Sequence, residues 1–120
     1  MSNKLNTRGR VHQDEFPSLV GTFAERASQY PDRVAIEASG RAMTNRQLLD
    51  WSAYLADSLA KHGVSPSTRV VIIGPRGPAV AAAMLATLSR GGVVVPLDWS
   101  TPADRRRLMV RDSEANLIIQ

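Results

Sequence analysis

The loop at residues 74–78, G-P-R-G-P, is a candidate anion-binding site. It follows an apolar run and precedes a predicted helix, and ligands of open α/β sheets bind at the carboxyl ends of the strands. Its backbone N–H groups and the guanidinium of Arg76 could bind an anion. However, its two prolines remove N–H donors, and its spacing fits neither the Walker nor the dinucleotide-binding fingerprint. We therefore favour a structural turn, with an anion site as the alternative.

Asp98 is the carboxylate whose position best suits catalysis, because it follows a strand predicted over residues 93–97. No histidine, lysine or second carboxylate lies at motif spacing from it, and no serine, histidine and acid arrangement stands out. On this basis we assign no catalytic, cofactor-binding or metal-binding residue to the chain.

Residues that bind metals are sparse. The chain has no cysteine, which excludes disulfides and thiolate metal sites. Its two histidines, His12 and His62, lie far apart in the sequence. His62 follows Lys61 at the predicted end of a helix, where a positive charge is favourable. Neither histidine has other ligand residues clustered near it in the sequence, so no metal role is expected.

Basic residues outnumber acidic ones, with 15 Lys and Arg against 11 Asp and Glu and a net charge of +4. Acidic residues are interleaved with the only basic cluster, and no exposed aromatic residues are expected beside it. The solvated face of a helix is therefore favoured over a nucleic-acid patch. The arginines of this cluster are Arg105, Arg106, Arg107 and Arg111.

Periodicity in the first half of the chain predicts a helix and a hairpin. A helix is expected over residues 18–30, because apolar residues recur on one stripe and Ser18 can cap its start. Short strands at residues 34–38 and 41–43 flank a Ser-Gly pair, which predicts a small β-hairpin.

A second helix is predicted over residues 45–62. Thr44 and Gln47 have the spacing of a capping box at its start, and Gly63 can end it. Its apolar stripe should pack on the core. Trp51 and Tyr54 are expected to pack at the edge of the core rather than to contact a ligand.

Strands and helices alternate in the second half of the chain. Strands are predicted at residues 69–74, 93–97 and 117–119, with helices beginning near Pro78 and Pro102. The first of these helices is apolar on nearly every face, so both its sides should be covered. The fold class is therefore α/β, an N-terminal helix and β-hairpin followed by a parallel β-α-β-α-β unit.

The strand at residues 93–97 and the turn before it have a distinctive composition. Gly91 suits the left-handed conformation that closes a helix, and Gly92 lets the backbone approach its neighbours closely. Three consecutive valines predict a strand that is covered on both faces. Pro96 lacks an N–H group, so the strand is expected to end near it.

Residues 88–98, L-S-R-G-G-V-V-V-P-L-D, resemble a core motif of adenylate-forming enzymes, above all the amino-acid-activating domains of nonribosomal peptide synthetases. That family writes the motif roughly L-K-A-G-x-x-Y-V-P-L-D, which aligns Gly91, Pro96 and Asp98. The resemblance implies that P-L-D is a structural corner, in which Asp98 accepts hydrogen bonds from backbone N–H groups. Residues 41–48, R-A-M-T-N-R-Q-L, resemble its G-R-x-L-T-Y-x-E-L motif. Asn45 replaces the tyrosine of that motif and Gln47 replaces the glutamate. The resemblance extends over residues 19–120.

The resemblance implies a reaction for a complete family member. Such an enzyme attacks the α-phosphate of Mg-ATP with a carboxylic substrate, releases pyrophosphate and passes the acyl group to a carrier thiol. ATP and magnesium are thus implied only for the complete member. The family's phosphate loop, ribose-binding aspartate and C-terminal catalytic lysine have no counterpart here. We therefore expect an N-terminal fragment or shortened member, inactive alone.

Length and composition predict one domain, with a mobile leader at residues 1–15 and a single α/β domain at residues 16–120. No apolar run reaches the ~20 residues of a membrane span, and no secretory signal is evident, so a cytoplasmic protein is expected. The rest of an adenylation domain or a synthetase protein is the expected partner, and an open apolar sheet edge would favour self-association. A non-catalytic docking module and a small nucleic-acid binder are the alternatives.

Overall fold

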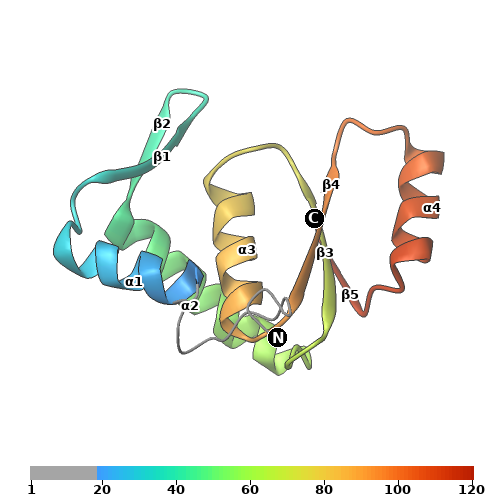
Figure 1. The fold of residues 1–120 in the computed structure, drawn as a ribbon. Helices are drawn as coiled ribbons and strands as arrows, with labels where there is room; N and C mark the ends of the chain where they lie inside the picture. The colour runs from blue at the N-terminus through green and yellow to red at the C-terminus, as the bar shows by residue number, and fades with distance from the viewer. Residues whose placement is uncertain (1–18) are drawn as a thin grey trace, which may run out of the picture.

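Helices and strands follow one another in the predicted order in the computed structural model, which describes residues 19–120 (Figure 1). The predicted leader, the helix cap Ser18 and His12 lie outside the described residues. None of the described helices is both long enough and apolar enough to cross a membrane. The elements are α1 (Leu19–Gln29), β1 (Val34–Ala38), β2 (Arg41–Thr44), α2 (Asn45–Lys61), β3 (Arg69–Gly74), α3 (Pro78–Ser89), β4 (Val93–Asp98), α4 (Ala103–Ser113) and β5 (Leu117–Ile119).

The β-hairpin forms as predicted, with β1 and β2 antiparallel. Ser39 and Gly40 at its tip both have positive φ angles, 54° and 77°. Two successive positive φ angles match the twist of a two-residue hairpin, and they suit a short polar residue followed by glycine. The hairpin leads directly into α2.

Helix α2 begins with the predicted capping box. Thr44 Oγ1 accepts a hydrogen bond from Gln47 N at 3.1 Å, and Gln47 Oε1 accepts one from Thr44 N at 2.9 Å. Gly63 follows the helix with a φ of 86°. Trp51 is half-buried as expected. The prediction for Tyr54 is wrong, since this residue is 73% exposed on the outer face of the helix.

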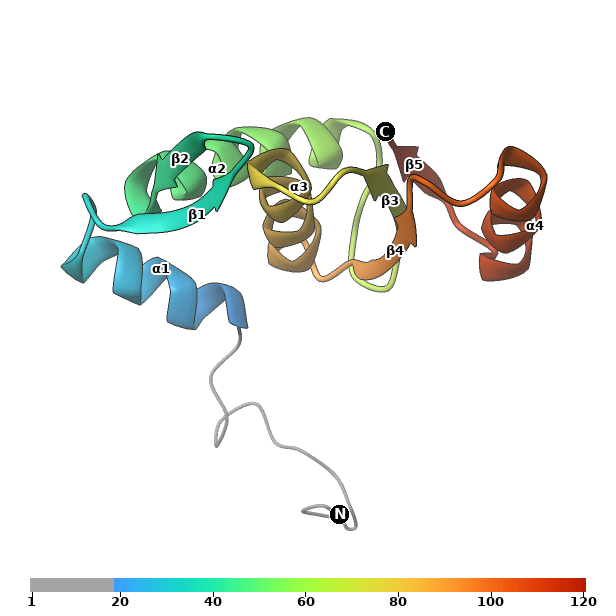
Figure 2. The same ribbon diagram turned by 90° about the horizontal axis from the view of Figure 1, so that it is seen from above.

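The second sheet is parallel, with the order β4-β3-β5. Val71 at the centre of β3 is in register with Val95 on one side and Ile118 on the other. Helices α2 and α3 lie on one side of this sheet and α4 on the other, as both views show (Figures 1 and 2). This arrangement confirms the predicted parallel β-α-β-α-β unit.

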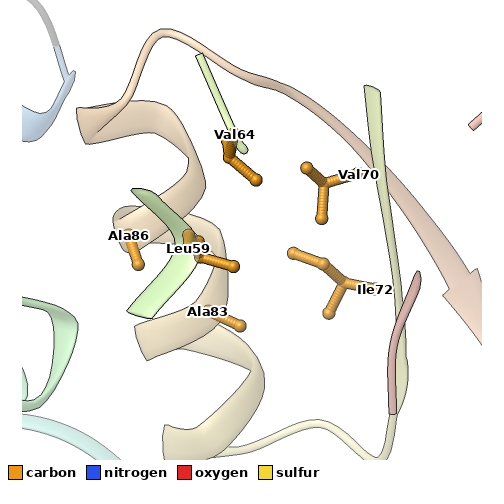
Figure 3. Close-up of a cluster of buried hydrophobic side chains, with 6 residues drawn as sticks. All are labelled: Leu59, Val64, Val70, Ile72, Ala83 and Ala86. Atoms are coloured by element: carbon orange, nitrogen blue, oxygen red, sulfur yellow. The ribbon is translucent and has the colours of Figure 1, made fainter. Parts of the chain in front are cut away.

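The hydrophobic core lies between β3 and the helices α2 and α3 (Figure 3). Val70 and Ile72 of β3 point toward the helices and are 0% and 2% exposed. The alanines of α3 let it approach both the sheet and α2 closely, which removes the facing apolar surfaces of the three elements from water. The core side chains are Leu59, Val64, Val70, Ile72, Ala83 and Ala86.

Strand β4 differs from its prediction in two ways. Val93 is 46% exposed and its two valine neighbours are half-buried, so the strand is not covered on both faces. The strand also continues through Pro96 to Asp98. Both differences arise because β4 is an edge strand of the described sheet. An edge strand needs only alternate N–H groups for its single neighbour, so a proline is tolerated there.

Helix α3 is only partly covered, contrary to the expectation from its apolar composition. Its fully buried side faces β3 and α2, but Ala81, Leu85 and Leu88 are half-buried. These three residues line an open apolar groove of about 480 Å³ that α1 and β1 also border.

The turn between α3 and β4 is tightly packed, as its two glycines predict. Gly91 has a φ of 76°, the left-handed conformation expected after a helix. A Cβ atom on Gly92 would lie 2.8 Å from Thr87 Cγ2 and 3.2 Å from the carbonyl oxygen of Thr68. The chain therefore passes against α3 where only a hydrogen atom fits.

We expect Gly92→Ala to lower the free energy of unfolding by about 1–3 kcal/mol, the usual cost of overpacking a core. Thr87→Ser removes the clashing methyl group and keeps the hydroxyl that donates to the carbonyl oxygen of Ala83 at 2.8 Å. Gly92→Ala should therefore cost less in the Thr87→Ser background. Urea denaturation of the four proteins measures this coupling. Equal costs in the two backgrounds would contradict the close packing of Gly92 on Thr87.

The far side of the sheet is thinly covered. Helix α4 has no buried residue among those described, and Leu108 and Met109 are 49% and 41% exposed. Ile118 of β5 is 45% exposed. In the described structure β5 pairs only with β3, so its outer edge is open. An open apolar strand edge favours pairing with another chain.

The 120-residue polypeptide is therefore expected to self-associate as its concentration rises, and sedimentation velocity measures this. Ile118→Lys should weaken the association because a charge on an edge strand opposes pairing. Ala53→Lys on the exposed face of α2 is the matched control and should change nothing. A monomer at high concentration with a melting temperature above roughly 60 °C, the upper range for mesophilic domains, would contradict the prediction.

Candidate functional site

An open cavity of about 570 Å³ lies where β3 and β4 end. Gly74 and Asp98 are register partners at the last positions of the two strands. Ligands of parallel α/β sheets bind at this edge. The cavity combines an apolar floor with charged and aromatic side chains at its rim, and its lining residues are Ile72, Gly74, Arg76, Val80, Met84, Pro96, Leu97, Asp98 and Trp99.

Asp98 accepts hydrogen bonds as the sequence predicts. Its Oδ1 atom accepts bonds from Ser100 N at 3.0 Å and from Ser100 Oγ at 2.8 Å. These two bonds hold the pKa of the Asp98 carboxyl below its ordinary value of 3.8, against the opposing effect of desolvation, and the positive charge of Arg76 lowers the pKa by a lesser amount. Asp98 is therefore ionised at neutral pH.

Arg76 and Asp98 lie at one site, although they belong to different loops. Both side chains line the cavity, and both residues are exposed. Arg76 makes no hydrogen bond or ion pair with any residue that the structure describes, so its influence on Asp98 acts through space. The sequence indicated each residue separately. Bringing them together required the parallel pairing of β3 with β4.

Arg106, which the sequence placed in a solvated cluster, contacts the loop beside this cavity without lining the cavity itself. Arg106 Nη1 donates hydrogen bonds to the carbonyl oxygens of Trp99 at 3.0 Å and Thr101 at 2.8 Å. The guanidinium thus braces the loop between β4 and α4 from the helix side. Its neighbours in the sequence are also arginines, so composition gave no signal that would single it out.

The residues around this cavity do not suit a nucleoside triphosphate. The ionised carboxylate of Asp98 would repel phosphate oxygens, and prolines at positions 75 and 78 remove backbone donors from the facing loop. Within residues 19–120, no group of three or more His, Cys, Asp or Glu side chains is arranged to hold a metal ion. We derive no catalytic step from this cavity.

His62 lies apart from the cavity. Its Nδ1 atom is 2.8 Å from the carbonyl oxygen of Ser58, so the ring contacts the last turn of α2. It borders a separate groove beside β5 together with Leu59 and Leu117. This position agrees with the helix-end role predicted for it.

The four arginines of the basic cluster on α4 differ in the contacts that they make. Arg106 is occupied by the loop, and Arg107 forms an ion pair with Asp104 one turn earlier. Arg105 and Arg111 are exposed and make no ion pair among the described residues. Two of the four arginines are therefore engaged by other groups of the protein, and two are not.

Comparisons with known proteins agree with the fold. The family model described as AMP-binding enzyme matches residues 23–120. A plipastatin synthase of Bacillus subtilis (strain 168) is 37% identical over 114 residues, covering 95% of this chain and 4% of that protein. Syringomycin synthase SyrB1 of Pseudomonas syringae pv. syringae is 39% identical over 97 residues, covering 81% of this chain and 16% of that protein. The chain therefore spans only a small part of these relatives.

Solved structures show the same likeness. The N-terminal subdomain of Klebsiella oxytoca NpsA superposes with a TM-score of 0.79 and 27% identity, covering 86% of this chain and 27% of that chain. The nonribosomal peptide synthetase FmoA3, in its α-methyl-L-serine-AMP bound form, gives a TM-score of 0.79 and 27% identity over 83% of this chain and 11% of that chain. The chain belongs to the AMP-binding enzyme family and matches the N-terminal part of nonribosomal peptide synthetase adenylation domains.

Proposed function

We propose that this chain supplies the first β-α-β-α-β unit of an adenylation domain, which activates a carboxylic substrate, commonly an amino acid, as its acyl-adenylate. The observation that carries the proposal is the superposition of 86% of the chain on 27% of the NpsA N-terminal subdomain. A unit of this size provides scaffold, and the chemistry belongs to other segments of the domain. ATP and magnesium are accordingly cofactors of the complete domain.

Exposed apolar surfaces support the proposal that the rest of an adenylation domain packs against this chain. Apolar side chains are exposed on three separate features: the open edge of β5, the outer side of α4, and the groove between α1, β1 and α3. Large exposed apolar surfaces mark protein interfaces. We infer that the rest of an adenylation domain covers them, either in the same polypeptide or as a separate synthetase protein.

The 120-residue polypeptide is expected to show only background exchange of labelled pyrophosphate into ATP with each of the twenty amino acids. The reason is that the family's phosphate loop and catalytic lysine have no counterpart in these residues. A complete adenylation domain assayed in parallel is the positive control. Clear amino-acid-dependent exchange by this polypeptide would overturn the scaffold assignment.

The genomic reading frame provides the complementary experiment. A longer frame that encodes an in-frame Ser/Thr/Gly-rich phosphate loop, when expressed whole, should exchange pyrophosphate with at least one carboxylic substrate. A frame that stops after Gln120 would favour the non-catalytic docking module instead.

The division of the α4 arginines predicts weak, unselective binding to nucleic acid. If Arg105, Arg106 and Arg107 neutralised three phosphates, the slope of log affinity against log salt would be about −2 to −3. We expect a slope of smaller magnitude than this, and equal affinity for DNA and heparin. Arg105→Gln and Arg111→Gln should each bring the slope closer to zero. Tight DNA binding that resists heparin competition and is lost in these variants would restore the nucleic-acid hypothesis.

A further inference from the structure

We propose that the outer edge of β5 binds an extended peptide segment in which acidic and apolar residues alternate. The segment adds to the sheet as the next strand beside β5. Its acidic side chains face the arginines of α4, and its apolar side chains face α2. The proposal names the chemistry of the segment that covers this edge, and it rests on the proposed function only in that a partner covers the edge.

The main chain of β5 has donors and acceptors available at its outer edge. Asn116 N donates a hydrogen bond to the carbonyl oxygen of Arg69 at 2.8 Å, one residue before β5 begins. In a parallel ladder, alternate residues direct their N–H and C=O groups to the same neighbouring strand. The corresponding groups of Leu117 and Ile119 therefore point away from β3, where no described strand pairs with them. An added peptide strand would satisfy these groups.

Strand β5 separates two open grooves, and Ile118 and Gln120 line both of them. One groove, of about 430 Å³, also borders α4, and the other, of about 280 Å³, also borders α2. These helices lie on opposite sides of the sheet (Figure 1). Successive side chains of a strand point to opposite faces. A peptide strand beside β5 would therefore place alternate side chains in the two grooves.

The groove on the α4 side is basic above an apolar floor. Its charged lining residues are Arg106, Arg107 and Arg111, and none of its lining residues is acidic. Arg111 forms no ion pair within residues 19–120. Arg107 pairs with Asp104 at the surface, and a guanidinium has enough N–H groups to bind a second carboxylate. Charge complementarity therefore favours acidic side chains in this groove.

The groove on the α2 side has the opposite character. No Asp, Glu, Lys or Arg lines it, and its polar lining residues are Ser58, His62 and Gln120. Apolar side chains placed there would be removed from water against leucine and isoleucine. Its apolar lining residues are Leu55, Leu59, Ala83, Leu117, Ile118 and Ile119.

The difference between the two grooves gives the edge its selectivity. A strand with lysine in place of the acidic residues would be repelled by three arginines. A wholly apolar strand would cover these arginines without offering them a partner, which costs free energy. Only a strand with acidic residues on one face and apolar residues on the other suits both grooves, so the edge discriminates between partners.

Fluorescence anisotropy of short peptides with a neutral fluorophore tests the proposal. The 120-residue chain is titrated, at concentrations where it is monomeric, into the acidic peptide V-E-V-E-V-E-V or the basic peptide V-K-V-K-V-K-V. We expect saturable binding of the acidic peptide and at least about fivefold weaker binding of the basic one. Strand addition uses the N–H groups of only one alternate set. N-methylation of either all valines or all glutamates should therefore abolish binding, and methylation of the other set should be tolerated.

Arginine variants locate the peptide on the α4 side. Arg107→Gln and Arg111→Gln should each weaken the acidic peptide about two- to fivefold and strengthen the basic one. Arg105→Gln is the matched control, because Arg105 is an exposed residue of the same helix that does not line the groove. It should change binding of either peptide by less than about 1.5-fold.

Equal binding of the acidic and basic peptides, equal effects of the two N-methylations, or an equal effect of Arg105→Gln would overturn the proposal. If neither peptide binds and the chain forms dimers that Ile118→Lys disrupts, a second copy occupies the edge, which would also overturn it. None of these results bears on pyrophosphate exchange by a complete domain, so the scaffold assignment would stand or fall separately.

Discussion

The burial of β3 is the constraint on which the rest of this structure depends. Val70 and Val71 at its centre are fully buried although they point to opposite faces of the sheet. A strand of this kind needs neighbours on both edges and cover on both faces. The chain supplies the edges as β4 and β5, and it covers one face with α2 and α3 and the other with α4. Crossover connections are required because parallel strands cannot be joined by tight turns.

Sequence patterns predicted most of this fold because strong local signals coincide with tertiary packing. Three local signals each indicated one structure, and the observed fold agrees with all of them. They are the capping box at Thr44 and Gln47 for a helix start, the glycines at positions 91 and 92 for a tight turn, and the apolar run of β3 for a buried strand. The prediction that β4 is covered on both faces and ends near Pro96 was wrong, because a run of valines does not show whether a strand lies at the centre or at the edge of a sheet. Position in the sheet depends on pairing between distant segments, which periodicity does not encode.

The cavity could be predicted only in part for the same reason. Arg76 and Asp98 each stood out by their place after a strand, but only the pairing of β3 with β4 puts them on one rim. Arg106 was indistinguishable from its neighbours until its hydrogen bonds to the β4–α4 loop were known. The likeness to NpsA explains the scaffold, whereas the chemistry of this rim follows from its own side chains.

Native-state hydrogen exchange by NMR, at concentrations where the chain is monomeric, tests the central role of β3 most directly. Slow exchange reports the part of a protein that opens only on global unfolding. The amides of Val70, Val71 and Ile72 should be the slowest to exchange, with those of β5 and α4 much faster. If the amides of α2 and α3 exchange most slowly and those of β3 exchange as fast as those of β5, the pair of helices is the most stable part of the fold. That result would contradict the central role of β3.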